Sequence, residues 1–335
     1  MTHDAPISDR RPLNQETIEW LDNLEDLGED RGYFEPLGAR HSAILTDAGP
    51  RLLVTFESIE SILSETEDNL PLGFEMVAEN GWSNLCLLAH GPSWFRDPHV
   101  YGYFDRLVDD GFFEDFDQVV FYGAGMCGYG ASAFSVVAPG ATVIAVQPQA
   151  TLDPRVAEWD MRFPSLRRTS FTDRYGFAPD MIEAADRAFI LYDPEEELDA
   201  MHAALFTRQN VTRLRCRHLG HLIDQHLIAM DILQPLIERA MEGTLRAEDF
   251  HQLYRARRSY PPYLRRLLTR VDDDDRLMLA GILCRNVIAR MNGPRFRRRL
   301  EQVEKQLTAL GRALPPPRHI ATQDDASGPA AKETA

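Results

Sequence analysis

A glycine-rich corner at residues 123–130, GAGMCGYG, contains the residue types in this chain that are best suited to chemistry. An apolar, β-prone run at 119–122 precedes it, and small apolar residues at 131–137 follow it. This pattern predicts a buried strand, a sharp turn and a tightly packed helix. Glycines allow strained backbone angles at such a corner and let the helix approach its neighbours closely. A turn of this kind can hold a reactive side chain above a sheet, where it acts as a nucleophile.

The corner resembles the nucleophile elbow of the α/β-hydrolase superfamily, in the form G-x-S-M-G-G-Y found in esterases and in hydrolase-like proteins of glycan modification and accessory secretion. The resemblance places Gly123 at the first glycine, Met126 after the nucleophile and Gly128 at the last glycine. Gly125 stands where the serine belongs, and Cys127 stands where a glycine belongs. Gly125 has no side chain and cannot be a nucleophile. The resemblance therefore implies a degenerate elbow, with an oxyanion position at Met126.

The resemblance also implies that an acid and then a histidine follow the elbow along the chain. Asp193 directly follows the predicted strand 187–192, and His221 follows the predicted strand 211–216. In a complete triad the carboxylate orients the imidazole, and the imidazole accepts the proton of the nucleophile. Asp193 could instead cap the acidic helix after it, where the glutamates at 195–197 compete for the acid position. His221 could equally serve only as a packing or capping residue.

Cys127 is the remaining candidate for a nucleophile. In the first turn of the elbow helix, the helix dipole would favour the thiolate and lower the pKa of the thiol. Its side chain lies two residues beyond Gly125, however, and a lone cysteine is more often a small buried side chain. Two functions stay open: binding of a small molecule or a protein partner without serine-dependent turnover, and a Cys127-dependent hydrolase or transferase acting on acyl or glycan esters. The sequence leaves open whether the chain is an enzyme.

A nucleotide-linked function is the weakest alternative. The corner contains G-x-G-x-x-G from Gly123 onward, a pattern typical of dinucleotide-binding turns. The acid that should follow about 20 residues later falls in the apolar run 144–146, and the G-K-S/T of a phosphate-binding loop is missing. The chain also resembles proteins called phosphoadenosine phosphosulfate (sulfonucleotide) reductases, but it lacks their Ser-Gly-Gly-x-Asp-Ser loop and their C-terminal catalytic cysteine. We therefore expect no cofactor.

The composition limits the class of protein and the cellular compartment that we expect. Its 335 residues, of which 44% are hydrophobic, are enough for one large domain with a helical appendage. No apolar run approaches the ~20 residues of a membrane span, and the N-terminus lacks the apolar segment of a secretory signal. The four cysteines, at 86, 127, 216 and 284, form no C-x-x-C pair, which favours buried thiols in a reducing compartment over disulfides or a zinc site. We expect a cytoplasmic protein without a metal.

The formal net charge of −16 is unevenly distributed. From Leu236 onward the chain has 19 Lys and Arg against 13 Asp and Glu, so the acidic excess lies in residues 1–235. An acidic main body argues against binding to nucleic acid or to anionic membranes. The C-terminal part is basic, with four arginines from Arg295 to Arg299, so binding of nucleic acid or of an anionic membrane stays a weak alternative for that part.

Alternating strand-like and helical patterns predict a mostly parallel α/β-hydrolase-like sheet with helices on both faces. The predicted strands are 43–45, 51–56, 84–89, 119–122, 142–146, 187–192 and 211–216. The predicted helices include 16–27, 100–108, 194–205 and 222–241. We predict a disordered segment at 1–14, an α/β-hydrolase-like domain at 15–242, a helical C-terminal extension at 243–314 and a disordered tail at 315–335.

Overall fold

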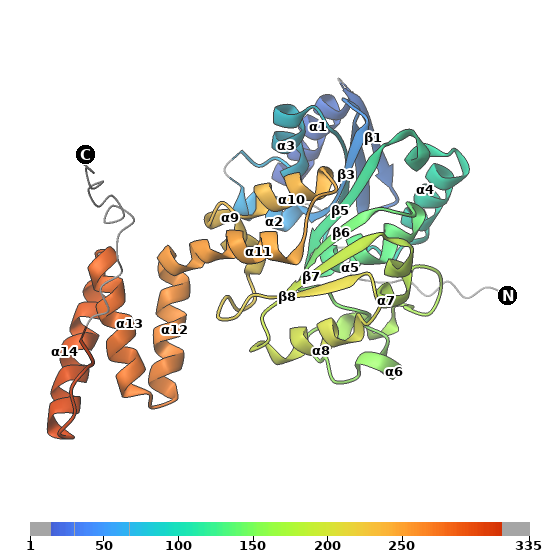
Figure 1. The fold of residues 1–335 in the computed structure, drawn as a ribbon. Coiled ribbons are helices and arrows are strands. Elements are labelled where there is room, and N and C mark those ends of the chain that lie inside the picture. The colour runs from blue at the N-terminus through green and yellow to red at the C-terminus, as the bar shows by residue number, and fades with distance from the viewer. Residues whose placement is uncertain (1–14, 30, 67, 317–335) are drawn as a thin grey trace, which may run out of the picture. The chain divides into compact units, whose positions relative to one another are not determined.

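The computed structural model describes residues 15–29, 31–66 and 68–316, which form two compact units (Figure 1). The first unit ends at Tyr260 and the second begins at Pro261. The sequence patterns had suggested a boundary at 242/243, but Phe250 and Tyr254 are buried, and the Tyr254 hydroxyl donates to the Arg217 carbonyl at 3.2 Å. The predicted disordered segments fall outside the described residues, apart from 315 and 316.

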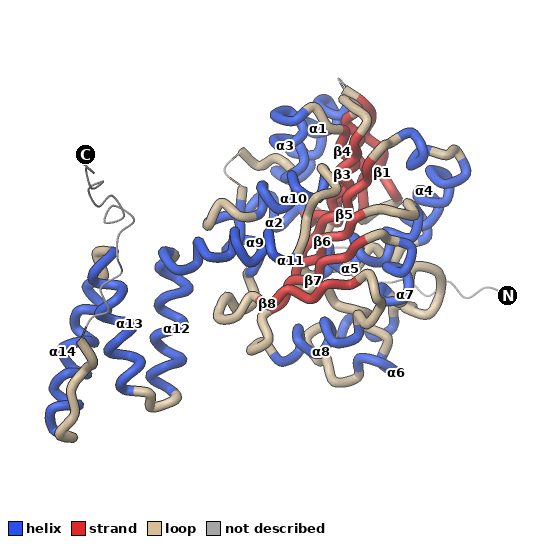
Figure 2. The backbone as a smooth tube through the Cα atoms, viewed as in Figure 1, coloured by secondary structure: helices blue, strands red, loops and turns tan. Residues whose placement is uncertain are grey.

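The first unit is built on one sheet of eight strands in the order β1-β2-β4-β3-β5-β6-β7-β8 (Figure 2). The strands are β1 Gly32–Leu37, β2 His41–Thr46, β3 Arg51–Ser58, β4 Ser83–Ala89, β5 Gln118–Ala124, β6 Thr142–Val146, β7 Arg187–Tyr192 and β8 Val211–Arg215. β2 runs antiparallel to β1 and β4, and the remaining pairs are parallel. The predicted mostly parallel sheet is confirmed, and β5 lies well inside it.

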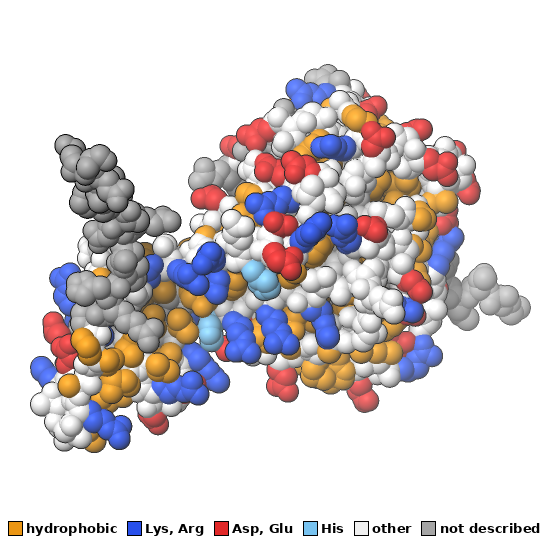
Figure 3. Space-filling model, in the orientation of Figure 1, with side chains coloured by type: hydrophobic (Ala, Val, Ile, Leu, Met, Phe, Trp, Pro, Cys, Tyr) orange, Lys and Arg blue, Asp and Glu red, His pale blue; other side chains and the backbone are white. Residues whose placement is uncertain are grey.

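The two edge strands are built differently from the central ones. β1 has the sequence GYFEPL. It was not predicted, because glycine and proline are not typical of strands, but proline is tolerated in a strand at a sheet edge. β8 carries exposed Arg213 and Arg215 beside buried Leu214. Figure 3 shows basic side chains over the part of the molecule where β8 lies. Charged side chains on an edge strand hinder pairing with another chain.

Helices cover both faces of the sheet, as predicted. Figure 1 shows α1, α3 and α10 on one side and α4, α5 and α7 on the other. The helices of this unit are α1 Gln15–Glu29, α2 Ile59–Glu65, α3 Leu72–Asn80, α4 Pro98–Asp109, α5 Met126–Phe134, α6 Pro154–Ala157, α7 Ala178–Met181, α8 Glu197–Leu205, α9 Ile223–Ala229, α10 Leu233–Met241 and α11 Ala247–Leu253. The single helix expected at 222–241 is two helices, because the chain turns at Asp231, which has a φ of +55°.

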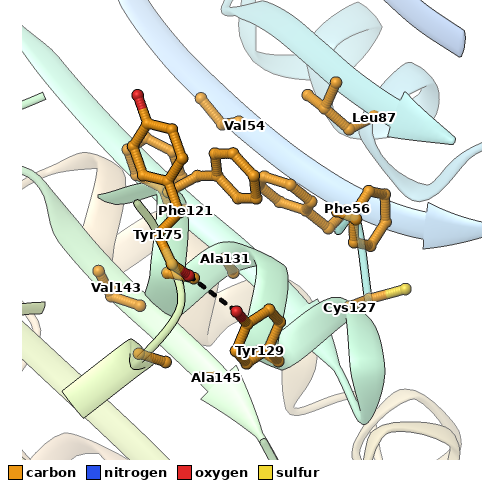
Figure 4. Packing of buried hydrophobic residues seen from close by; sticks show 14 of the residues in the cluster. Val54, Phe56, Leu87, Phe121, Cys127, Tyr129, Ala131, Val143, Ala145 and Tyr175 are labelled. Carbon is orange, nitrogen blue, oxygen red and sulfur yellow. Dashed lines mark hydrogen bonds between the residues drawn. The ribbon is translucent and has the colours of Figure 1, made fainter. Parts of the chain in front are cut away.

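The core beneath the glycine corner is aromatic. The Phe56 ring stacks near Phe134, with centroids 5.6 Å apart, and meets Phe95 edge-on at 4.8 Å. Tyr129 of α5 is fully buried, and its hydroxyl donates to the Tyr175 carbonyl at 2.7 Å (Figure 4). Because α5 is anchored in this way, the turn in front of it has a fixed position over the sheet.

The second unit is the predicted helical extension. It consists of α12 Pro261–Asp273, α13 Leu277–Arg290 and α14 Pro294–Ala309. Leu268, Cys284 and Val303 lie in its small apolar core, and Arg299 on α14 forms an ion pair with Asp272 on α12 at 2.8 Å. None of the helices in the described part of the chain has the length and apolar character that a membrane crossing requires.

Candidate functional site: a polar cavity at the elbow

Gly125 forms the tip of the corner between β5 and α5. Its backbone angles are φ +58° and ψ −122°, a region that residues with a side chain rarely adopt. The Gly125 N–H donates to the Val146 carbonyl at 2.8 Å, which ties the tip to the end of β6. A Cβ built on Gly125 would have no atom within 4 Å. A side chain at this position would therefore stand free above the sheet, as a nucleophile must.

The neighbouring glycines allow the close approach of strand and helix. A Cβ on Gly123 would lie 2.3 Å from the carbonyl oxygen of Cys127. A Cβ on Gly128 would lie 3.0 Å from the carbonyl oxygen of Val146. Since real Cβ atoms almost never come this near to backbone, glycine is needed at Gly123, and Gly128 leaves little room for anything larger. Met126 begins α5 directly after the tip, so its N–H is among those that the start of a helix leaves without an intrahelical acceptor.

A polar cavity of about 210 Å³ opens at the tip. It brings together residues from six parts of the chain, each at the carboxyl end of a strand or in a connection or helix that follows it. Its lining residues are Ser61, Ala124, Gly125, Gln147, Gln149, Arg162, Asp199, His221, Leu222, Asp224 and Gln225. Ligands of open α/β sheets bind outside the carboxyl ends of the strands, so this cavity is the candidate site.

One wall of the cavity is a network of charged and amide side chains. Arg162 donates to Asp199 at 2.6 Å and also contacts both carboxylate oxygens of Asp160. Gln147 donates to the other oxygen of Asp199 at 2.7 Å, and its own amide oxygen accepts the N–H of Ile223 at 3.1 Å. Arg162 is thus shared between two carboxylates, and the wall has a net negative charge.

The buried side chain of His202 contacts Asp160 and so supports this network. Its Nδ1 accepts the Ala150 N–H at 3.1 Å, so the ring proton lies on Nε2, 3.0 Å from Asp160. Burial raises the pKa of Asp160, but hydrogen bonds from His202 and from Arg162 lower it more, so that the pKa of Asp160 lies well below its usual range. Asp160 is consequently ionised at neutral pH.

Strained backbone supports the amide wall. Gln147 and Trp94 are non-glycine residues with φ of +48° and +51°. The Trp94 indole N–H donates to the amide oxygen of Gln149 at 3.0 Å, which directs the Gln149 side chain. Residues held in sparsely populated conformations cluster at functional sites. Their position here is a reason, independent of the cavity itself, to regard the elbow as functional.

The predicted acid and base do not form a pair in this structure. Asp193 is buried and accepts the N–H groups of Gly220 at 2.8 Å and of Glu195 at 3.0 Å. His221 lines the cavity, but its side chain is 71% exposed, and its Nδ1 lies 3.1 Å from Oε2 of Glu196. Asp193 therefore positions the loop that carries His221, while Glu196 provides the carboxylate next to the imidazole.

Cys127 is buried on α5. It does not line the tip cavity, but it lines a larger cavity next to it. Burial raises the pKa of its thiol well above the usual value, and the charges of Glu57, Asp224 and Glu60 raise it further. These effects outweigh the helix dipole, which alone would favour a thiolate. The thiol is neutral at physiological pH.

Several residues of the cavity were not predicted from the sequence. Gln147 and Gln149 could have been found, because the run QPQ directly follows the predicted strand 142–146 and strand ends carry ligand contacts. Arg162 and Asp199 lie 37 positions apart and give no local signal. Within residues 15–29, 31–66 and 68–316, no group of three or more His, Cys, Asp or Glu side chains is arranged to hold a metal ion.

The sheet, the elbow between β5 and α5, and the flanking helices give the chain an α/β-hydrolase fold. No family model matches the chain, and no curated protein matches it. Solved structures similar to it include an acetyl xylan esterase from Paenibacillus sp. R4, at 15% identity over 72% of this chain and 100% of that one, with a TM-score of 0.39.

Two further solved structures are similar in the same range. An S-formylglutathione hydrolase from Agrobacterium tumefaciens has 15% identity over 62% of this chain and 91% of its own, with a TM-score of 0.41. A capsule O-acetyltransferase of Neisseria meningitidis serogroup A has 12% identity over 61% of this chain and 94% of its own, with a TM-score of 0.37.

Proposed function

We propose that this chain binds a small polar molecule in the cavity at Gly125 and forms no covalent intermediate with it. The observation that carries the proposal is the geometry of Gly125, which has the backbone angles of an elbow tip and open space where a nucleophile would stand. The turn has room for a nucleophilic side chain, but glycine has no side-chain atom that could react.

The lining of the cavity suits recognition better than acyl transfer. Arg162, Gln147 and Asp199 hold one another at 2.6 and 2.7 Å, so they are rigid and directed before any ligand arrives. Binding to such a preorganised site loses little side-chain entropy. A small molecule with several hydroxyl, amide or amine groups fits these groups, and we prefer it to a protein partner because a cavity of about 210 Å³ cannot take a large side-chain surface.

The rival function is ester hydrolysis or acyl transfer through Cys127. Its thiol is buried and neutral, and it lies outside the tip cavity. Catalysis at Cys127 would need a thiolate within reach of a base. His221, the base that the sequence suggests, lines the tip cavity, whereas Cys127 lines the larger cavity next to it.

The test is hydrolysis of p-nitrophenyl acetate by the wild type, by Gly125→Ser and by Cys127→Ala. We expect the wild type and Cys127→Ala to equal the buffer rate, and Gly125→Ser to exceed it, because oxyanion donors persist when a nucleophile is absent and each can contribute ~2.7–4 kcal/mol. Wild-type turnover that is lost in Cys127→Ala would establish the rival.

A matched control separates chemistry from strain. Gly140 also has a positive φ, of +87°, and open space around an added Cβ. The Gly140→Ser variant therefore carries the same kind of backbone penalty away from the elbow, and we expect it to be inert towards the ester. Circular dichroism must show that both serine variants are folded before their rates are compared.

A further inference from the structure

A second, larger cavity of about 640 Å³ adjoins the polar cavity at the tip. Ser61, Ala124, Asp224 and Gln225 line both of them. The second cavity extends from this shared border between the end of β3, helix α2 and helix α9. One molecule of modest size can therefore lie across the border, with one part in each cavity.

The second cavity offers apolar surface on two sides. Leu72 of α3 and Ile228 of α9 supply the accessible part of this surface, whereas Phe56 and Ile62 are 1% and 2% exposed and lie beneath it. Ile228 is 52% exposed, so its side chain is not fully covered by the rest of the protein. Burying such surface against a ligand contributes about 25 cal/mol per Å².

The charges that line the second cavity are all negative. Glu57 and Asp224 are its charged residues, and no Lys, Arg or His is among the described residues that line it. Glu57 accepts the Leu72 N–H at 3.0 Å, and its other oxygen lies 3.5 Å from the Cys86 thiol. Burial raises the pKa of Glu57 and also that of Asp224. Neither carboxyl has a cation from the protein in this cavity.

We propose that the second cavity binds an organic amine, with its ammonium group beside Asp224 and its apolar part along Leu72 and Ile228. A charge-assisted hydrogen bond from an ammonium to a half-buried carboxylate is stronger than a neutral one. A ligand carrying a carboxylate would face two like charges, so fatty acids and other anions are rejected. The inference rests on the proposed function, since the polar end of the same molecule would occupy the tip cavity.

The experiment is isothermal titration calorimetry with three probes of equal chain length: n-hexylamine, 1-hexanol and hexanoate. It is run at 0.15 M salt, where charges more than ~8 Å apart are largely screened, so that the net charge of −16 does not dominate. We expect hexylamine to bind at least tenfold more tightly than hexanol, and hexanoate to give no heat. Equal affinity for the amine and the alcohol, or no binding of the amine, would overturn the proposal.

Variants locate the site. Asp224→Asn keeps the shape of the side chain and removes its charge, and we expect at least a tenfold loss of hexylamine affinity. Ser61→Phe, at an exposed position that lines both cavities, should block binding by filling the border. Asp186→Asn, at a side chain that is 65% exposed elsewhere, is the matched control and should bind as the wild type does. Unchanged affinity in both cavity variants would contradict the assignment.

The two proposals fail in different ways. Ester turnover by the wild type would refute non-covalent binding at Gly125 and leave the calorimetric result for hexylamine standing. If the wild type neither hydrolyses esters nor binds hexylamine, only the amine site is refuted.

Discussion

The carboxylate of Glu196 lies beside the imidazole of His221, with 3.1 Å between Oε2 and Nδ1. Asp193, at the acid position that the chain order suggests, instead holds the backbone of Gly220 and Glu195. In a triad one acid lies next to the histidine ring, whereas here two carboxyl groups lie near the histidine and make different contacts. One shapes the loop that carries the histidine, and the other lies next to its ring.

Asp193→Asn should destabilise the protein by about 1–3 kcal/mol, because the amide would turn a donor towards one of the two N–H groups that the carboxylate now accepts, those of Gly220 and Glu195. Glu196→Gln should change the free energy of unfolding by less than ~1 kcal/mol, since exposed ion pairs contribute little. Urea denaturation of both variants measures the difference. If Glu196→Gln proved the more destabilising of the two, the structural role assigned to Asp193 would be wrong.

The strand, the turn at Gly125 and the helix after it were predictable from the sequence because their signal is local. Gly123, Gly125 and Gly128 are needed within a few residues of one another, and the strand before them is a continuous apolar run. The choice between Asp193 and Glu196 depends on the path of the chain from Cys216 to His221, which no local pattern encodes.

The charged wall of the site was beyond prediction for a similar reason. Arg162 lies in the connection between α6 and α7, where the sequence has no regular strand or helix pattern. Its partner Asp199 comes from α8, which follows α7 and β7 along the chain. Such contacts are fixed by packing across the sheet, and neither residue alone is distinguishable from a solvent-exposed charge.

Cys127 should react slowly with alkylating agents in the folded protein. Burial and the nearby carboxylates raise the pKa of its thiol, and the thiolate is the reactive form. At pH 8 we expect iodoacetamide to modify Cys127 at least tenfold more slowly in native protein than in protein unfolded in urea, as measured by peptide mass spectrometry. Rapid modification of the native thiol would revive the Cys127-dependent mechanism.

His41 should make the protein less stable in mild acid. Its ring is buried, with Nε2 2.7 Å from Ser93 Oγ, and burial lowers its pKa to about 3. Because the unfolded chain takes up a proton below pH ~6.5 and the folded ring does not, the free energy of unfolding falls as the pH drops from there, by up to ~1.4 kcal/mol per pH unit.

The check for His41 is urea denaturation of the wild type and of His41→Gln between pH 7 and 4. The variant should lose stability less steeply than the wild type, while His221→Gln, at an exposed histidine, should follow the wild-type curve. Parallel curves for the wild type and His41→Gln would show that the buried histidine does not cause the pH dependence.

The absence of a nucleophile at Gly125 is tested most directly by intact-protein mass spectrometry after incubation with a fluorophosphonate, which forms a stable adduct with activated serines and requires no knowledge of the natural ligand. We predict that the wild type keeps its unmodified mass and that Gly125→Ser gains the mass of one adduct. Digestion and peptide mapping should then assign the adduct to the peptide that contains position 125. A stoichiometric adduct on the wild type would contradict the account, because it would reveal an activated nucleophile that the geometry at Gly125 does not provide.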